Sequence, residues 1–210
     1  MKKIGIMGGT FDPIHIGHLI LGEEAFVEFQ LDEIWFMPAG NPPHKQKRTG
    51  GASDKERVEM VKKAISSNPH FSLCLEEMNT EGITYTYRIL ENLSYKYPEY
   101  QFYFIIGSDS LKDFPKWRNP LRICQLCTLL VANRPSSDNH YLEEKIAEIK
   151  EKFQANIYKL NSPNMELSSH DLRKRVQASQ SIRYYVTDQV HQYIHQNHIY
   201  DKIGENHLDL

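Results

Sequence analysis

Short hydrophobic runs alternate with longer amphipathic segments along most of the chain. The apolar runs predict buried strands at residues 3–7, 33–38, 71–78, 101–107, 127–133 and 156–160. Apolar residues with helical spacing predict helices between them, at residues 16–29, 53–65, 85–97 and 141–153. Strands that alternate with helices are typical of a parallel sheet covered on both faces. The pattern therefore predicts an α/β fold with a doubly wound parallel sheet.

The pattern becomes purely helical after Met165. Residues 168–177 and 187–197 are predicted to form two terminal helices that close the carboxyl-end edge of the sheet. No linker or internal repeat divides the chain, so we expect a single domain over residues 1–210, with residues 165–210 as its C-terminal helical part. Such sheets bind ligands beyond the carboxyl ends of their strands, at the point where the strand order switches. Candidate functional residues are therefore those that directly follow strands.

Composition excludes several classes of protein. The 210 residues are 40% hydrophobic and 25% charged, as in an ordinary globular protein, and the net charge of -2 gives no general reason to bind nucleic acid or a membrane surface. The first apolar run, Ile4 to Met7, is too short for a signal peptide, and no later run approaches the length of a membrane span. We therefore expect a cytoplasmic protein. The sequence leaves its oligomeric state open.

Two of the three cysteines, Cys124 and Cys127, have the C-x-x-C spacing of some zinc and redox sites. They lie in an apolar stretch, and no second cysteine pair follows to complete a zinc site. We interpret them as buried structural thiols in a reducing compartment.

The most informative stretch follows the first predicted strand. Gly8 and Gly9 stand where this strand turns into a helix, so their backbone amides could approach a phosphate closely. The stretch matches neither the G-x-G-x-x-G of dinucleotide-binding dehydrogenases nor a P-loop. His15 and His18 then lie about one helical turn apart, facing the same way at the positive end of the helix. Two imidazoles facing one anion suit phosphate-group transfer, which mainly requires positioning and charge stabilisation rather than a protein nucleophile.

The segment GGTFDPIHIGH at residues 8–18 resembles the motif of the nucleotidyltransferases that share H-x-G-H. Other segments narrow the resemblance to the bacterial nicotinate-nucleotide adenylyltransferases: PAGNPPHK at residues 38–45, TYT at 84–86, IIGSDSL at 105–111, FPKW at 114–117 and LSSHDLR at 167–173. The resemblance spans nearly the whole chain, and it implies a Rossmann-like nucleotidyltransferase fold.

The resemblance also implies a reaction. AMP is transferred from ATP to nicotinate mononucleotide, giving nicotinate adenine dinucleotide and pyrophosphate on the route to NAD, by direct attack of the acceptor's 5′-phosphate on the α-phosphate of ATP. It assigns His18 and His15 to catalysis, with His18 as the main stabiliser of the transition state. It assigns ATP binding to Gly8, Gly9, Thr10, Phe11, His15, His18, Gly107, Ser108, Asp109, Ser168, Ser169 and Arg173.

Acceptor binding is implied for Lys45, for the backbone amides of Thr84, Tyr85 and Thr86, and for Trp117, which would stack on the pyridine ring. Each residue also has a structural explanation. Lys45 lies in a charged run, the threonines precede a predicted helix and could cap it, and a tryptophan is often core.

The segment at residues 167–173 departs from the family in one position. Ser168 and Asp171 have the spacing of a capping box, and Arg173 suits the outer phosphates of ATP. The family usually has a hydroxyl residue after the serine pair, whereas this chain has His170, so any contact made from that position is in doubt.

The implied metal is Mg²⁺ carried with ATP, for which no protein cage is expected. His191, His195 and His198 follow helical spacing, but their apolar neighbours indicate a packing face rather than a metal site. Rival interpretations are transfer of AMP to nicotinamide mononucleotide or phosphopantetheine, and a regulatory module that binds ATP without catalysis. The TYT segment and Trp117 oppose phosphopantetheine, and both histidines with Lys45 and Arg173 oppose a non-catalytic module.

Overall fold

The computed structural model describes residues 1–40, 51–80, 82–132, 139–163 and 165–201. Within these ranges the chain forms one six-stranded sheet with the order β3-β2-β1-β4-β5-β6, and every neighbouring pair of strands is parallel. The strands are β1 (Lys2–Gly9), β2 (Glu33–Pro38), β3 (Phe71–Leu73), β4 (Tyr100–Gly107), β5 (Cys127–Ala132) and β6 (Ile157–Leu160). The strand order reverses between β1 and β4, so a ligand is expected where these two strands end.

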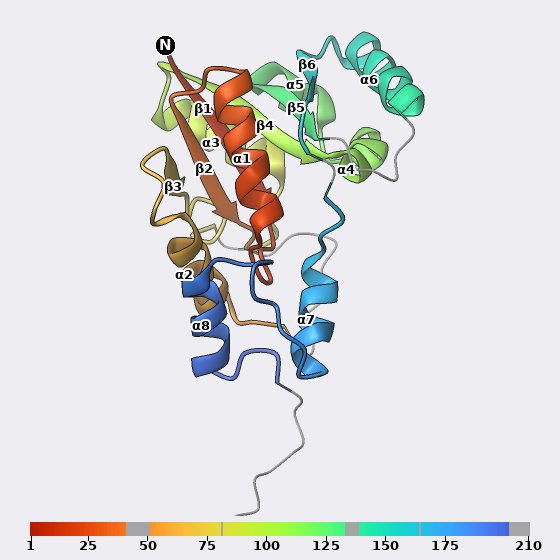
Figure 1. Ribbon diagram of the computed structural model, residues 1–210. Coiled ribbons are helices and arrows are strands. Elements are labelled where there is room, and N and C mark those ends of the chain that lie inside the picture. Colours follow the sequence, from red (N-terminus) through yellow and green to blue (C-terminus); the bar gives the residue numbers. More distant parts are fainter. Residues whose placement is uncertain (41–50, 81, 133–138, 164, 202–210) are drawn as a thin grey trace, which may run out of the picture.

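Helices cover both faces of the sheet (Figure 1). The hydrophobic cluster on one face includes residues of α1 (Ile16–Glu28), α2 (Asp54–Ile65), α7 (Ser169–Gln177) and α8 (Asp188–Gln196). The cluster on the other face includes residues of α3 (Thr86–Lys96), α4 (Ser108–Asp113), the 3-10 helix η1 (Phe114–Lys116), α5 (Pro120–Leu126) and α6 (Asn139–Phe153). The α/β fold with a doubly wound parallel sheet is therefore confirmed.

Alternation of side chains along the central strands builds the two hydrophobic clusters. Ile4 and Ile6 of β1 and Phe104 of β4 pack on the side of α3, whereas Met7 and Ile105 pack on the side of α1. Both faces are buried, which explains why these strands are continuous apolar runs in the sequence.

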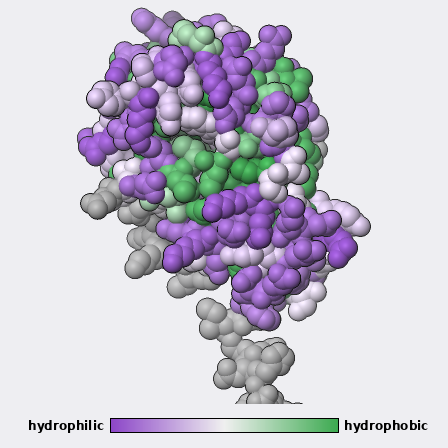
Figure 2. Space-filling model, turned by 90° about the vertical axis from the view of Figure 1, so that its left-hand side faces the viewer, coloured by the Kyte–Doolittle hydropathy of each residue, from purple (hydrophilic) through white to green (hydrophobic). Residues whose placement is uncertain are grey.

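The terminal helices α7 and α8 lie beyond the carboxyl ends of β1 and β2, at the bottom of Figure 1. Figure 2 shows the side that carries β3 and α2. Hydrophilic side chains cover its upper and lower parts, and a hydrophobic band crosses it near the level where the strands end. The C-terminal helices therefore close the carboxyl-end edge of the sheet, as the sequence predicts.

Two parts of the sequence prediction are wrong. The strand expected at residues 71–78 ends at Leu73, which pairs with Phe36, and β2 continues to Pro38 without a partner on this side because the chain leaves β2 after the backbone N–H of Cys74 donates to the carbonyl of Phe36 at 2.9 Å. Residues beyond it turn back instead, with the backbone N–H of Asn79 donating to the carbonyl of Leu75 at 3.0 Å. The short helices α4 and α5 were not predicted, because neither is long enough to show a helical period.

Candidate active site

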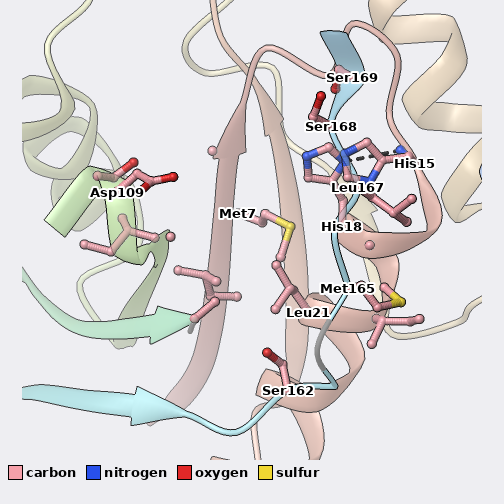
Figure 3. Close-up of a pocket in the computed structure, with 18 of the residues that line it drawn as sticks. Met7, His15, His18, Leu21, Asp109, Ser162, Met165, Leu167, Ser168 and Ser169 are labelled. Atoms are coloured by element: carbon pink, nitrogen blue, oxygen red, sulfur yellow. Dashed lines mark hydrogen bonds between the residues drawn. The ribbon is translucent and has the colours of Figure 1, made fainter. Parts of the chain in front are cut away.

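An open cavity of about 280 Å³ lies at the switch point of the sheet, on the side covered by α1. Its walls come from the ends of β1, β4 and β5, the first turns of α1, α4 and α7, and the segment after β6 (Figure 3). The lining residues include Met7, Gly8, His15, Gly17, His18, Leu21, Gly107, Asp109, Ser162, Met165, Leu167, Ser168 and Ser169. The location follows the rule for ligand binding in open parallel sheets.

His15 and His18 form a stacked pair at one wall of the cavity. His15 is the N-cap of α1, and its backbone N–H donates to Nδ1 of His18 at 3.2 Å. The two ring centroids are 3.7 Å apart and the ring planes differ by 24° (Figure 3). Because a backbone N–H can only donate, Nδ1 of His18 is the acceptor, and the ring proton is on Nε2. His18 therefore carries an N–H donor on the ring edge away from the helix backbone.

Two neighbours fix the orientation of these rings. A Cβ atom at Gly17 would lie 3.1 Å from Nδ1 and 3.2 Å from Cε1 of His15, so any larger residue would push the His15 ring away by a few tenths of an ångström. Phe11 has a φ of 49°, which is rare for a bulky residue, and its buried ring meets the His18 ring edge-on with centroids 5.0 Å apart. The imidazole positions are thus set by local backbone conformation and by packing.

Side chains from distant elements hold the loop between β1 and α1. The buried Arg57 of α2 donates to the carbonyl of Thr10 at 2.7 Å and to the carbonyl of Ala39 at 2.8 Å. Ser169 Oγ donates to the carbonyl of Pro13 at 2.9 Å, and Arg173 Nη1 donates to the carbonyl of Asp12 at 2.6 Å. The loop is therefore attached both to α2 and to α7.

The serine pair lies at the start of α7 and on the cavity wall. Ser168 is the N-cap, and its Oγ accepts from the backbone N–H of Asp171 at 3.1 Å, so the capping interpretation is confirmed for this residue. His170 is exposed and does not line the cavity. Arg173 does not line it either, because its side chain lies against the loop.

The residues expected around adenosine fall into two groups. Gly107 and Asp109 line the cavity, and Asp109 lies across it from the imidazoles (Figure 3). A Cβ atom at Gly107 would meet nothing within 4 Å, so the backbone there is open to a ligand. Ser108 is buried, and neither it nor Gly9, Thr10 or Phe11 is among the residues that line the cavity.

The residues expected to bind the acceptor lie on the other face of the sheet. Trp117 is half-buried and meets Phe104 of β4 with ring centroids 6.5 Å apart. Thr84 is buried, and its Oγ1 donates to Oε1 of Glu77 at 2.9 Å, while Tyr85 is the N-cap of α3 without a side-chain capping bond. Threonine capping therefore does not explain Thr84, and Thr86 is the first residue of α3. Lys45 lies outside the described residues.

Sequence reasoning missed one wall of the cavity. Ser162, Pro163, Met165 and Leu167 connect β6 to α7 and line the side opposite β4. Their signal was their place directly after a predicted strand, which is where ligands of such sheets bind.

The histidines and cysteines with the spacing of metal or redox sites lie outside the cavity. Among the described residues, no group of three or more His, Cys, Asp or Glu side chains is arranged to hold a metal ion. His191 and His195 contact each other with ring centroids 4.5 Å apart, whereas His198 pairs with Asp201. Cys124 and Cys127 are buried free thiols, and burial raises the pKa of Cys124 to about 11. The described helices include none that is both long and apolar enough to cross a membrane.

Comparisons with known proteins define the class first. The model of the cytidylyltransferase-like family matches residues 6–175. The match covers most of the chain, which is thus a nucleotidyltransferase of this class. Such transfer from ATP generally needs a divalent metal ion.

Individual relatives then define the family. The chain is 43% identical over 194 residues to a protein of Lachnoclostridium phytofermentans named a probable nicotinate-nucleotide adenylyltransferase, covering 92% of this chain and 96% of that protein. It is 38% identical over 205 residues to a protein of the same name from Thermoanaerobacter sp., covering 97% of each chain. This chain belongs to the nicotinate-nucleotide adenylyltransferase family.

The fold is shared with more distant solved structures. Nicotinic acid mononucleotide adenylyltransferase of Plasmodium falciparum, complexed with NaAD, matches with a TM-score of 0.76 at 22% identity, over 95% of this chain and 98% of that one. The same enzyme complexed with APC matches with a TM-score of 0.74.

Proposed function

We propose that this chain transfers AMP from ATP to nicotinate mononucleotide, forming nicotinate adenine dinucleotide and pyrophosphate in NAD biosynthesis. The observation that carries the proposal is the stacked pair of His15 and His18 beside the cavity at the switch point. This geometry presents N–H donors to a phosphate at the N-terminus of α1, where the helix dipole also favours negative charge. Membership of the family supports the substrates.

The reaction needs no covalent intermediate with the protein. An oxygen of the acceptor's 5′-phosphate forms a bond to the α-phosphorus of ATP, and the bond from that phosphorus to the oxygen that bridges to the β-phosphate breaks. The electron pair leaves with pyrophosphate. His18 donates from Nε2 to the phosphate oxygens as charge develops on them. His15 holds the His18 ring in place, because its own ring stacks on that ring and its backbone N–H donates to Nδ1.

We propose roles for the remaining residues from the family to which the chain belongs. Gly8, Gly9, Thr10 and Phe11 form the loop under the phosphates, and Ser168, Ser169 and Arg173 face the outer phosphates from α7. Gly107, Ser108 and Asp109 flank the adenosine at the end of β4. The acceptor would lie on the α3 side, against Trp117 and the amides of Thr84, Tyr85 and Thr86, with Lys45 reaching its phosphates.

The metal ion that we propose is Mg²⁺ carried by ATP. Mg²⁺ commonly binds through substrate phosphates and keeps several waters, and it neutralises charge on the triphosphate. We also propose that residues 1–210 act as one domain, with residues 165–210 as its C-terminal helical part. The free thiols fit a reducing cytoplasm as the place of action.

The proposal is tested by pyrophosphate release from ATP and Mg²⁺ with three acceptors: nicotinate mononucleotide, nicotinamide mononucleotide and phosphopantetheine. A strong preference for nicotinate mononucleotide is expected, because backbone N–H groups before α3 favour a carboxylate. Equal use of the amide would contradict the proposed carboxylate recognition. ATP binding without release with any acceptor would instead indicate a regulatory module.

A further inference from the structure

Asp12 is a buried carboxylate that three distant parts of the chain contact. Only 3% of it is exposed, and its Oδ1 accepts from the hydroxyl of Tyr200 at 2.7 Å and from the backbone N–H of Ala52 at 3.0 Å. Its Oδ2 faces Arg173 Nη1 at 3.7 Å. A buried charge is costly unless donors surround it, so each of these contacts matters to the loop that carries His15 and His18.

Arg173 is close to this carboxylate but does not form a direct hydrogen bond with it. Charge-assisted hydrogen bonds between such groups are about 2.7–2.9 Å long, and the distance here is 3.7 Å. Nη1 donates instead to the backbone carbonyl of Asp12 at 2.6 Å. Among the described residues, this is the sole hydrogen bond of the Arg173 guanidinium, so its Nε and Nη2 remain available to another acceptor.

Tyr200 reaches Asp12 from the end of the described chain through an unusual backbone path. His198 and Tyr200 both have positive φ, 52° and 73°, which costs about 1–2 kcal/mol for each such residue. This path buries the Tyr200 ring, with its hydroxyl also 3.9 Å from the sulfur of Met60. This strained backbone path brings a neutral donor, the Tyr200 hydroxyl, within hydrogen-bond distance of the buried Asp12 carboxylate.

We propose that Tyr200 is a positioning residue for ATP: its hydroxyl satisfies Asp12 and so leaves the Arg173 guanidinium free to bind the outer phosphates. Without this donor, Asp12 takes its missing hydrogen bond from Arg173, and the resulting ion pair withdraws the positive charge from the substrate. The inference rests on the proposed function, because it assigns Arg173 to the phosphates of ATP.

The test compares Tyr200→Phe with Tyr103→Phe, which removes the hydroxyl of another tyrosine of the same hydrophobic cluster, on β4. For Tyr200→Phe, the KM for ATP, the Kd of ATP without acceptor and the inhibition constant of pyrophosphate are all expected to rise about tenfold, the loss of one hydrogen bond to a charged group. The KM for nicotinate mononucleotide is expected to stay unchanged, and Tyr103→Phe is expected to match the wild type.

A double-mutant cycle separates positioning from simple loss of stability. In an Arg173→Ala background, Tyr200→Phe is expected to have no further effect on ATP binding, because its effect acts through Arg173. The inference is overturned if Tyr200→Phe leaves ATP binding unchanged, if it weakens both substrates equally, or if it weakens ATP binding as much without Arg173. Failure of the wild type to release pyrophosphate would overturn the proposed function itself.

Discussion

His15 and His18 stack with their ring centroids 3.7 Å apart, and the backbone N–H of His15 donates to Nδ1 of His18. This hydrogen bond has two effects. It gives the backbone N–H of the N-cap residue an acceptor at the start of α1, and it places the ring proton of His18 on Nε2, from which it can be donated to a phosphate. The H-x-G-H spacing therefore has a local structural cause in addition to its proposed role with phosphate.

Substitutions of His18 can separate these two roles. Asparagine can still accept from the His15 backbone N–H but has no donor at the position of Nε2, whereas alanine lacks both. His18→Asn is expected to retain the thermal stability of the wild type and to lose about a hundred- to a thousandfold in kcat, the usual effect of removing one transition-state donor. His18→Ala is expected to fold and to lose at least as much activity.

Steady-state kinetics and thermal denaturation check this prediction, with His198→Asn, on an exposed ring outside the cavity, as the control. Near-normal turnover by a folded His18→Asn variant would contradict the role of Nε2.

Gly17 and Gly22 lie on the same helix and offer a matched pair of substitutions. A Cβ at Gly17 would lie 3.1 Å from the His15 ring, and a Cβ at Gly22 would lie 3.1 Å from the Phe36 ring. Gly17→Ala crowds the ring of His15, a proposed catalytic group, whereas Gly22→Ala crowds the rings of Phe36 and Phe71. Gly17→Ala is expected to lower kcat about tenfold or more, since small displacements of reacting groups are costly. Gly22→Ala is expected to affect stability alone, and equal losses of kcat would argue against a fixed His15.

Arg57 stabilises the loops that follow β1 and β2. Its replacement by alanine leaves the carbonyls of Thr10 and Ala39 without their donor, at a cost of about 3 kcal/mol, or about 6–12 °C in Tm. Its carboxylate partner Asp54 is exposed, so Asp54→Asn is expected to change Tm much less. Thermal denaturation of both variants measures the difference, and an equal fall in Tm would mean that the ion pair, rather than the two carbonyl contacts, is what stabilises the loops.

Alkaline pH is expected to destabilise the protein through two buried groups. Burial, with Asp12 beside it, raises the pKa of Tyr200, and burial raises the pKa of Cys127. Both groups stay protonated in the folded protein but ionise once unfolded, so the unfolded chain binds fewer protons. Their stabilisation is complete below their ordinary pKa values, 9.0 for the cysteine and 10.0 for the tyrosine, and is lost as pH rises above them.

The free energy of unfolding should fall with a slope of about 1.4 kcal/mol per pH unit for each group. Urea denaturation between pH 8 and pH 11 checks this; Cys127→Ser and Tyr200→Phe should each make the fall shallower. An unchanged slope in both variants would show that other groups control alkaline unfolding.

The sequence predicts most of the fold because its strands are buried on both faces. The runs at β1, β4 and β5 have no polar alternation and are bounded by clear helical periods, so both their type and their order could be assigned. The end of β3 could not, because Cys74 and Leu75 are as apolar as a strand, and the turn in which the backbone N–H of Asn79 donates to the carbonyl of Leu75 has no apolar signature.

The sequence predicted some residues of the candidate site but not the contacts that hold them in place. Local motifs revealed His15, His18 and Ser168, whose geometry depends on one helix turn each. The attachments of Asp12 to Tyr200 and of Arg57 to Thr10 join residues 188 and 47 positions apart, and no local pattern carries such contacts. The same limit hid the cavity wall after β6.

The central claim is that the histidines position the phosphates and do not form a covalent intermediate. The most direct test is the stereochemical course at the α-phosphorus, using ATP with one oxygen of the α-phosphate replaced by sulfur in a single configuration and nicotinate mononucleotide as acceptor. Direct attack by the acceptor predicts inversion of configuration in the dinucleotide. Retention would indicate two displacements through an adenylylated residue, and would contradict the account.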